Sequence, residues 1–189
     1  ALVATEDARF FEHSGIDFRA WMRVLVKSIL LMNESAGGGS TLSQQLAKNL
    51  FPREDYLAFS IFINKIKEMI VARRLEQLYT KEELLRLYLN TVPFSENVFG
   101  IKVAARRFFN TSTEKLKVEE AAILVGMLKG TTIYNPVKYP ERAVKRRNIV
   151  ISQMAKYGYL SPEERDSLIA LPLDLQYFKE GTNLGIATY

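Results

Sequence analysis

Apolar residues recur at helical spacing along most of this 189-residue chain, and no other feature of the sequence limits the fold as strongly. Strict alternation of apolar and polar residues, which is typical of a β-strand, occurs only in short runs such as 174–178. A hydrophobic content of 48% excludes general disorder, and the length suffices for one sizeable core or for two small lobes that share a cleft. The sequence therefore predicts an all-α protein.

Capping residues and chain-breaking residues set the ends of the predicted helices. Asp17, Thr80 and Ser161 have the properties of N-caps, and the last two each begin a capping box with a glutamate three residues later. The triple glycine at 37–39 predicts the most flexible point of the chain. We expect helices at 2–12, 17–32, 41–49, 56–79, 80–90, 100–109, 113–128, 140–157 and 161–169, followed by an extended tail after residue 172.

Composition excludes several classes of site. The chain has no cysteine and one histidine, His13, which excludes disulfides, thiolate zinc sites, cysteine nucleophiles and histidine-rich metal sites. The net charge of +5 suits nucleic acid, an anionic membrane surface or a phosphorylated substrate, but no nucleic-acid-binding signature is present. No apolar run reaches the ~18 residues that span a bilayer. Because the chain begins at Ala1 inside a predicted helix, we expect an excised domain whose upstream anchor, if it has one, is missing.

Residues 56–79 form the longest predicted helix, and it is apolar nearly all round, which is typical of a buried helix. Lys65 and Glu68 project one turn apart among the apolar side chains of one face. A buried carboxylate loses its hydration, so it must be paired or have its pKa perturbed. The alternative is an ordinary ion pair between these two residues on a half-exposed helix.

Two segments near the start of the chain carry candidate chemistry. In a continuous helix, Glu6, Phe10 and His13 would share one face, and an aromatic neighbour can raise the pKa of a carboxyl toward the range of a proton-transfer group. The alternative is a surface helix whose charges face solvent. Glycines 37–39 then lead into a helix start, where free amides and the helix dipole favour an anion. The alternative is a flexible loop before a helix capped by Ser40 or Thr41.

Two later segments are weaker signals. Residues 84–90 are typical of a core helix that ends at Asn90, and the basic cluster at 145–148 is typical of a solvated face.

These five segments, in this order, resemble the peptidoglycan glycosyltransferase domain (glycosyltransferase family 51) of class A penicillin-binding proteins and monofunctional transglycosylases. The first family motif is matched by Glu6, Asp7, Phe10, His13 and Gly15. The second is matched by Gly38, Gly39, Ser40, Thr41, Gln44, Gln45, Lys48 and Asn49. Glu68 falls at the glutamate of the third, and residues 88–90 match the fourth. The resemblance covers nearly the whole chain.

The chain departs from the family at the third motif, where Asn64 stands in place of an arginine. A basic residue usually found just upstream, close to Ser60, is also missing, and Arg53 or Lys67 are the candidates to compensate. The transpeptidase domain of the bifunctional family members does not occur in this chain. We therefore expect a single peptidoglycan glycosyltransferase domain over 1–189, truncated at its N-terminus.

The resemblance implies a lysozyme-like head lobe with a smaller, membrane-associated jaw lobe. Residues 21–32 suit the jaw, where their apolar side chains would lie at the membrane interface; a helix that faces the core is the alternative. The implied reaction polymerises lipid II into glycan strands, with inversion at the anomeric carbon and release of polyprenyl pyrophosphate. Two rival functions are a lysozyme-like enzyme that cleaves glycan and a non-catalytic module that binds lipid II or peptidoglycan.

The resemblance also implies the roles of individual residues. Glu6 matches the catalytic base, and Glu68 assists departure of the pyrophosphate, directly or through a metal or water. The expected substrate-binding residues are Asp7, Phe10, His13, Gly39, Ser40, Thr41, Gln44, Gln45, Lys48, Asn49, Lys65, Asn90, Arg146 and Arg147. Among these, the lysines are expected to neutralise phosphate, with Arg146 and Arg147 as weaker candidates for the same task.

The expected partners are lipid II, the growing glycan chain, phosphoglycolipid inhibitors of the moenomycin type and the membrane surface, with no nucleic acid. No organic cofactor is expected, and a divalent cation (Mg or Mn) is an open possibility. The expected location is the periplasmic face of the bacterial cytoplasmic membrane, with the anchor helix outside this chain.

Overall fold

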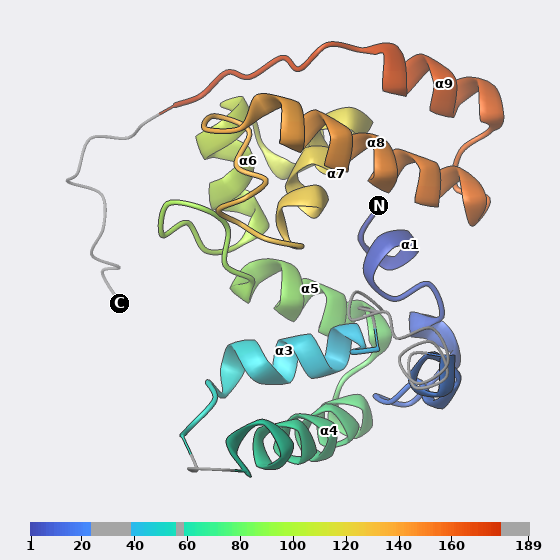
Figure 1. The fold of residues 1–189 in the computed structure, drawn as a ribbon, viewed down its shortest axis with the longest axis vertical. Coiled ribbons are helices and arrows are strands. Elements are labelled where there is room, and N and C mark those ends of the chain that lie inside the picture. Colours follow the sequence, from blue (N-terminus) through green and yellow to red (C-terminus); the bar gives the residue numbers. More distant parts are fainter. Residues whose placement is uncertain (24–38, 56–58, 179–189) are drawn as a thin grey trace. The chain divides into compact units, whose positions relative to one another are not determined.

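The computed structural model describes residues 1–23, 39–55 and 59–178, and these residues confirm the all-α class (Figure 1). Across these three ranges the structure has helices and no β-strand, and a single isolated bridge joins Pro93 to Phe99. The chain divides into two compact units, residues 2–92 and residues 93 onward with Ala1, which are described separately below. The predicted helix from 24 to 32, glycines 37 and 38, and the predicted helix start at 56–58 lie outside the described residues.

The unit of residues 2–92 is built around one short helix, α3, which is largely buried. Its elements are α1 (Leu2–Glu6), the 3-10 turn η1 (Phe10–Glu12), a helical segment at 18–23, α3 (Leu42–Leu50), α4 (Ser60–Leu78) and α5 (Lys81–Thr91). Helix α3 packs against both α4 and α5 (Figure 1). Thr41 caps α3 by accepting from the amide of Gln44, and the predicted capping box of Thr80 and Glu83 is present at the start of α5.

The expectation that the longest helix is buried is wrong. Only one stripe of α4 is covered, and it consists of Asn64, Glu68, Ala72 and Leu75. Three of its four isoleucines face outward, since Ile61, Ile66 and Ile70 are 79%, 41% and 57% exposed. Periodicity failed here because α4 packs against α3 along a stripe that contains polar residues, so the apolar side chains on its other sides remain at the surface.

The unit from residue 93 onward has α7 at its centre. Its elements are α6 (Ile101–Phe109), the 3-10 turn η3 (Thr113–Lys115), α7 (Val118–Met127), α8 (Pro140–Lys156) and α9 (Pro162–Ala170). Helix α7 packs against α6 and α8, and α9 packs on α8. The predicted helix at 113–128 is thus split, because Leu116 and Lys117 adopt extended backbone between η3 and α7.

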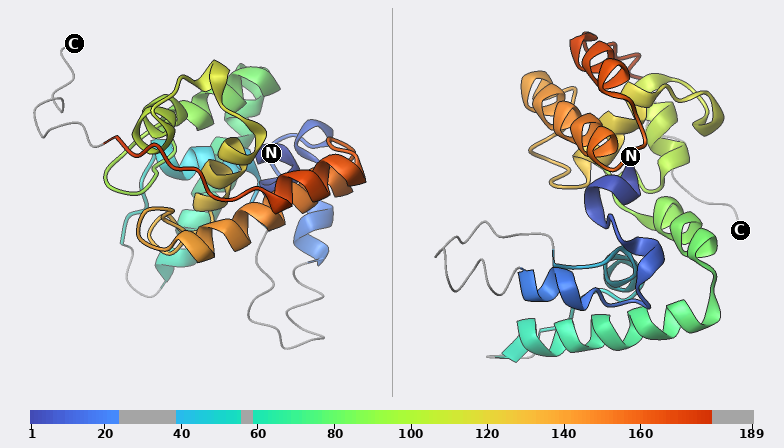
Figure 2. Two further views of the ribbon diagram at one scale, coloured as in Figure 1. Left: turned by 90° about the horizontal axis from the view of Figure 1, so that it is seen from above. Right: turned by 90° about the vertical axis from the view of Figure 1, so that its right-hand side faces the viewer.

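The tail after Pro172 has no regular secondary structure, as expected, and it runs back over this unit (Figure 2). It is held at its end, since the amide of Phe178 donates to the carbonyl of Arg107 at 2.8 Å and the hydroxyl of Tyr177 donates to Glu96 at 2.6 Å. Of the helices that the structure describes, none is long and apolar enough to cross a bilayer.

Candidate active site

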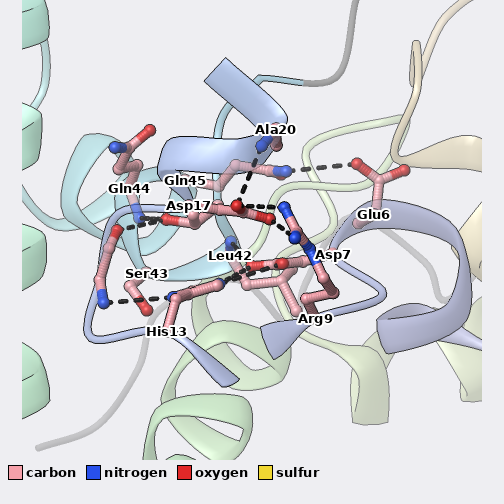
Figure 3. Close-up of polar contacts among 12 residues, drawn as sticks. Glu6, Asp7, Arg9, His13, Asp17, Ala20, Leu42, Ser43, Gln44 and Gln45 are labelled. Atoms are coloured by element: carbon pink, nitrogen blue, oxygen red, sulfur yellow. Dashed lines mark hydrogen bonds and ion pairs between the residues drawn. The ribbon is translucent and has the colours of Figure 1, made fainter. Parts of the chain in front are cut away.

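Glu6 is the last residue of α1, and its carboxylate is held by a side chain of α3. Gln45 donates from Nε2 to Oε2 of Glu6 at 3.2 Å, an interaction that Figure 3 shows beside the end of α1. The hydroxyl of Tyr88, from α5, in turn donates to Oε1 of Gln45 at 2.9 Å. The candidate base therefore receives a hydrogen bond from a glutamine that is itself fixed from a third helix.

The sequence pattern predicted that Phe10 and Glu6 share one helix face, and this prediction is wrong. Helix α1 ends at Glu6, and Phe10 begins the separate turn η1. The Phe10 ring is 1% exposed, and the ammonium of Lys81 lies 4.3 Å from its centroid. Phe10 is thus a core residue in this structure.

Asp7 joins the first motif to the second. Its Oδ2 accepts from the amide of Leu42, the first residue of α3, at 2.9 Å, and both of its oxygens contact Nε2 of His13 at 3.0–3.1 Å (Figure 3). His13 accepts from the amide of Gly15 at Nδ1, so the hydrogen-bond network assigns its proton to Nε2, which donates to Asp7. Asp7 and His13 are therefore arranged to fix the chain.

The helix start that was predicted to bind an external anion is already occupied. The carboxylate of Asp7 sits on the amide of Leu42, and Thr41 accepts from the amide of Gln44 with its Oγ1. An internal carboxylate at a helix N-terminus is favourable for the same reason that a phosphate would be. These two amides are thus satisfied within the protein, as in the alternative of a capped helix, and binding of an external anion by the loop before α3 stays a prediction.

Gly15 makes the close approach between this loop and α4 possible. Its φ of +91° lies in the region that side chains rarely adopt, and a Cβ there would meet the backbone of Ala72 and Arg73 at 3.0 Å. Its carbonyl accepts from Oγ1 of Thr41 at 2.7 Å. The glycine of the first motif therefore connects that motif to Thr41 of the second motif by a hydrogen bond.

Lys65 brings a positive charge to the start of α3. Its Nζ donates to Ser40 Oγ at 2.8 Å, to Gln44 Oε1 at 3.2 Å and to Glu68 Oε2 at 3.1 Å. Glu68 also accepts from Arg53 Nε at 2.8 Å, and its side chain is 7% exposed. The prediction that the Glu68 carboxylate must be paired is confirmed. The expected ion pair between Lys65 and Glu68 is present, and Arg53 completes a cluster of three charged side chains.

The electrostatics of this cluster favour an ionised Glu68. Burial raises the pKa of Glu68, but the hydrogen bonds and charges of Arg53 and Lys65 outweigh burial and hold the pKa below its ordinary value. A carboxylate in this state does not donate a proton at neutral pH. Its chemistry is to hold two cations side by side.

Asn64 occupies a structural position. Its side chain accepts from the amide of Glu54 at 3.1 Å and donates to the carbonyls of Glu54 and Ser60 at 2.7 and 2.8 Å. Of the two candidates to replace the family's arginine, Arg53 reaches Glu68, whereas Lys67 pairs with Glu54 at 3.4 Å. These residues line a cavity of about 330 Å³ beside α4, with Phe51, Asn64 and Ile70 among its walls.

The remaining predicted residues of this unit are more exposed. Gly39 and Asn49 are of intermediate exposure, and Lys48 lies exposed in the last turn of α3. Asn90 is exposed near the end of α5, which continues to Thr91. Their roles toward a substrate stay predictions.

The basic cluster of α8 is not a simple solvated face. Arg147 is 1% exposed and donates to the carbonyls of Ile169 and Pro172 at 3.0 and 3.3 Å, and burial lowers its pKa. Arg146 packs its stem close to Gly126 of α7. Arg147 thus holds the end of α9, and this structural role corrects its expected place on phosphate.

The described residues do not form a metal site. Within 1–23, 39–55 and 59–178, no three acidic or histidine side chains gather in a way that could hold an ion. Both oxygens of Glu68 accept from cationic side chains, which is the wrong environment for a further cation. The donor set of Glu68 therefore does not fit Mg²⁺ or Mn²⁺.

Sequence reasoning missed the contribution of Tyr88. The signal was present, because Leu84 and Tyr88 lie one turn apart on the buried face of α5, and a buried tyrosine hydroxyl requires a hydrogen-bond partner. The identity of that partner depends on a contact with α3, which no local pattern reveals.

Known proteins are similar to this chain in sequence, and one solved structure is similar to about half of it. A sequence model of the family described as Transglycosylase matches residues 1–155. Penicillin-binding protein 1A/1B of Bacillus subtilis is 44% identical over 170 residues, which cover 87% of this chain and 18% of the relative. Penicillin-binding protein 1F of the same organism is 39% identical over 164 residues, 87% of this chain and 22% of the relative.

Penicillin-binding protein 1A of Escherichia coli is 36% identical over 181 residues, 94% of this chain and 20% of the relative. The chain thus spans about a fifth of the length of these curated relatives. A crystal structure of penicillin-binding protein 1A from Haemophilus influenzae matches 53% of this chain and 15% of its own, with 34% identity and a TM-score of 0.50. This match agrees with the expected lysozyme-like, all-α fold.

Proposed function

The chain belongs to the transglycosylase family, and from this premise we propose that it polymerises lipid II into glycan strands and releases polyprenyl pyrophosphate. The observation that carries the proposal is the carboxylate of Glu6, hydrogen-bonded by Gln45 within the same compact unit that holds Lys65. A positioned base and a cation for the leaving group are the two groups that displacement of a pyrophosphate requires.

The reaction joins an acceptor lipid II to the growing chain. The acceptor's sugar hydroxyl attacks the anomeric carbon of the chain, and the bond from that carbon to the pyrophosphate oxygen breaks with inversion. The hydroxyl proton passes to Glu6, and the electron pair leaves with the pyrophosphate. Lys48 and Lys65 neutralise the charge that develops on this leaving group.

Glu68 acts in this scheme through its neighbours. As an ionised carboxylate between Arg53 and Lys65, it holds their charged groups in place. We propose this role instead of the assistance to the leaving group, directly or through a metal or water, that the resemblance implies. A neutralised pyrophosphate leaves readily without a second proton, in contrast to the alcohol leaving group of glycoside hydrolysis. The observed pairing of Glu68 suits a site that works by positive charge.

The membrane is part of the proposal because the substrate is a lipid. The outward face of α4 presents Ile61 and Phe62 at 79% and 66% exposure, and Phe18 and Met22 are also exposed at 72% and 54%. Such side chains suit the membrane interface. We place the chain at the periplasmic face of the bacterial cytoplasmic membrane, where it would also bind moenomycin-type phosphoglycolipids.

Incubation of the chain with lipid II tests the proposal. We expect glycan polymer; glycan fragments would instead indicate a lysozyme-like enzyme, and bound but unchanged lipid II would indicate a binding module. Glu6→Gln should lower the rate by roughly 10²–10⁴ with an unchanged circular dichroism spectrum, because the amide cannot accept the proton. Glu12→Gln, at an exposed carboxylate of η1, is the matched control and should keep the parental rate. A parallel reaction with a chelator measures the contribution of Mg²⁺ or Mn²⁺.

A further inference from the structure

Tyr88 is a buried tyrosine whose hydroxyl group donates its one hydrogen bond to Gln45. The residue is 2% exposed, and its hydroxyl donates to Oε1 of Gln45 at 2.9 Å. Burial, with a smaller contribution from the charge of Glu6, raises the pKa of Tyr88 well above its ordinary value. The phenol therefore keeps its proton and acts as a hydrogen-bond donor over the whole physiological pH range.

This donor fixes the direction of the glutamine amide. An amide side chain has an accepting oxygen at one end and a donating NH₂ group at the other, so a donor placed at one end determines what the other end presents. With the Tyr88 hydroxyl on Oε1, the NH₂ group of Gln45 faces Oε2 of Glu6. The reversed amide would set an oxygen against a carboxylate, where two acceptors repel each other.

We propose that Tyr88 and Gln45 are positioning residues for Glu6, joined in a hydrogen-bond chain of fixed polarity that runs from α5 through α3 to the end of α1. This inference rests on the proposed function, in which Glu6 is the base. This hydrogen-bond chain orients the carboxylate of Glu6 toward the acceptor hydroxyl.

Kinetics of lipid II polymerisation distinguish this role from that of an ordinary core tyrosine. Tyr88→Phe removes one oxygen and keeps the ring, so we expect kcat to fall about 10-fold to 100-fold with KM little changed. Tyr79→Phe, at a tyrosine that is 43% exposed, is the matched control and should keep both kcat and KM at their parental values.

A second substitution tests the coupling. Gln45→Met removes the amide, and we expect the Gln45→Met, Tyr88→Phe double variant to be no slower than Gln45→Met alone, because the phenol acts only through the amide. Equal, independent losses from the two changes would overturn the inference. A Tyr88→Phe variant with parental kcat would also overturn the inference. In that case, polymerisation by the parent would leave the proposed function intact.

A measurement without turnover covers the case in which the parent makes no polymer and the proposed function itself fails. The side-chain NH₂ protons of Gln45, followed by ¹⁵N-resolved NMR, should exchange slowly with water in the parent and faster in Tyr88→Phe. Unchanged exchange in a folded Tyr88→Phe variant would show that the phenol does not hold the amide, which contradicts the inference directly.

Discussion

Gly15→Ala tests how the first and second motifs are joined. The alanine would adopt a φ of +91°, a left-handed conformation that costs about 1–2 kcal/mol for an L-residue. Its Cβ would also lie 3.0 Å from backbone atoms of Ala72 and Arg73, which cannot rotate away as a flexible side chain can. Overpacking of this kind adds about 1–3 kcal/mol, so we expect a total loss of about 2–5 kcal/mol in the free energy of unfolding.

Gly158→Ala separates the two contributions. Gly158 has a φ of +77°, but no atom lies within 4 Å of the position of its Cβ, so only the backbone strain of about 1–2 kcal/mol applies. Urea unfolding followed by circular dichroism measures both variants, and the fluorescence of Trp21, the single tryptophan, reports on the unit that contains Gly15. A Gly15→Ala variant that is no less stable than Gly158→Ala would refute the argument that the loop approaches α4 at backbone distance.

Three further predictions follow from the cation cluster. Lys48→Met and Lys65→Met should each weaken binding of a moenomycin-type inhibitor by ~1–3 kcal/mol in a titration at fixed ionic strength. Lys102→Met, at an exposed lysine of the other unit, is the control. Parental affinity in both variants would show that these lysines do not contact the phosphate. Glu68 has a pKa held below its ordinary value of 4.5, so its stabilising contribution is present above that pH and is lost as the pH falls through the lowered pKa. Glu68→Gln should accordingly be less stable than the parent at pH 7 and show a shallower loss of unfolding free energy below about pH 4.5, and an unchanged slope would contradict the pairing. Asn64→Arg, which would restore the family's arginine, should lower the melting temperature because it breaks the hydrogen bonds to Glu54 and Ser60; an unchanged or higher melting temperature would refute the structural role.

Helix ends were predictable where the signal is local. Thr80 and Ser161 begin capping boxes that need only residues within one turn, and both boxes are present in the structure. The helix at 2–12 failed for the opposite reason. The chain leaves the helix after Glu6 because Asp7 accepts from the amide of Leu42, 35 positions along the chain. No window of neighbouring residues contains that contact.

The candidate site was predictable in its members but not in its connections. The pairing of Glu68 follows from burial alone, since a carboxylate on a covered helix face needs a cation. Arg53 was predicted only as one of two candidates to compensate for the missing basic residue, and its pairing with Glu68 was not predicted, because it depends on the conformation of its loop. The link from Glu6 through Gln45 to Tyr88 joins residues 39 and 43 positions apart, so it depends on how α1, α3 and α5 pack.

The carboxylate of Asp7 at the start of α3 has a consequence for the dependence of binding on salt. Because the Leu42 amide at that helix end donates to Asp7, the proposed attraction for a pyrophosphate would come from side-chain cations such as the exposed Lys48. Mobile surface charges are screened over a Debye length of about 8 Å at physiological ionic strength, whereas a buried helix end is screened much less. If the chain polymerises lipid II as proposed, its binding of the lipid pyrophosphate should therefore weaken as the salt concentration rises. An enzyme that must release one lipid carrier in every cycle would gain turnover from a contact that ions in solution can replace.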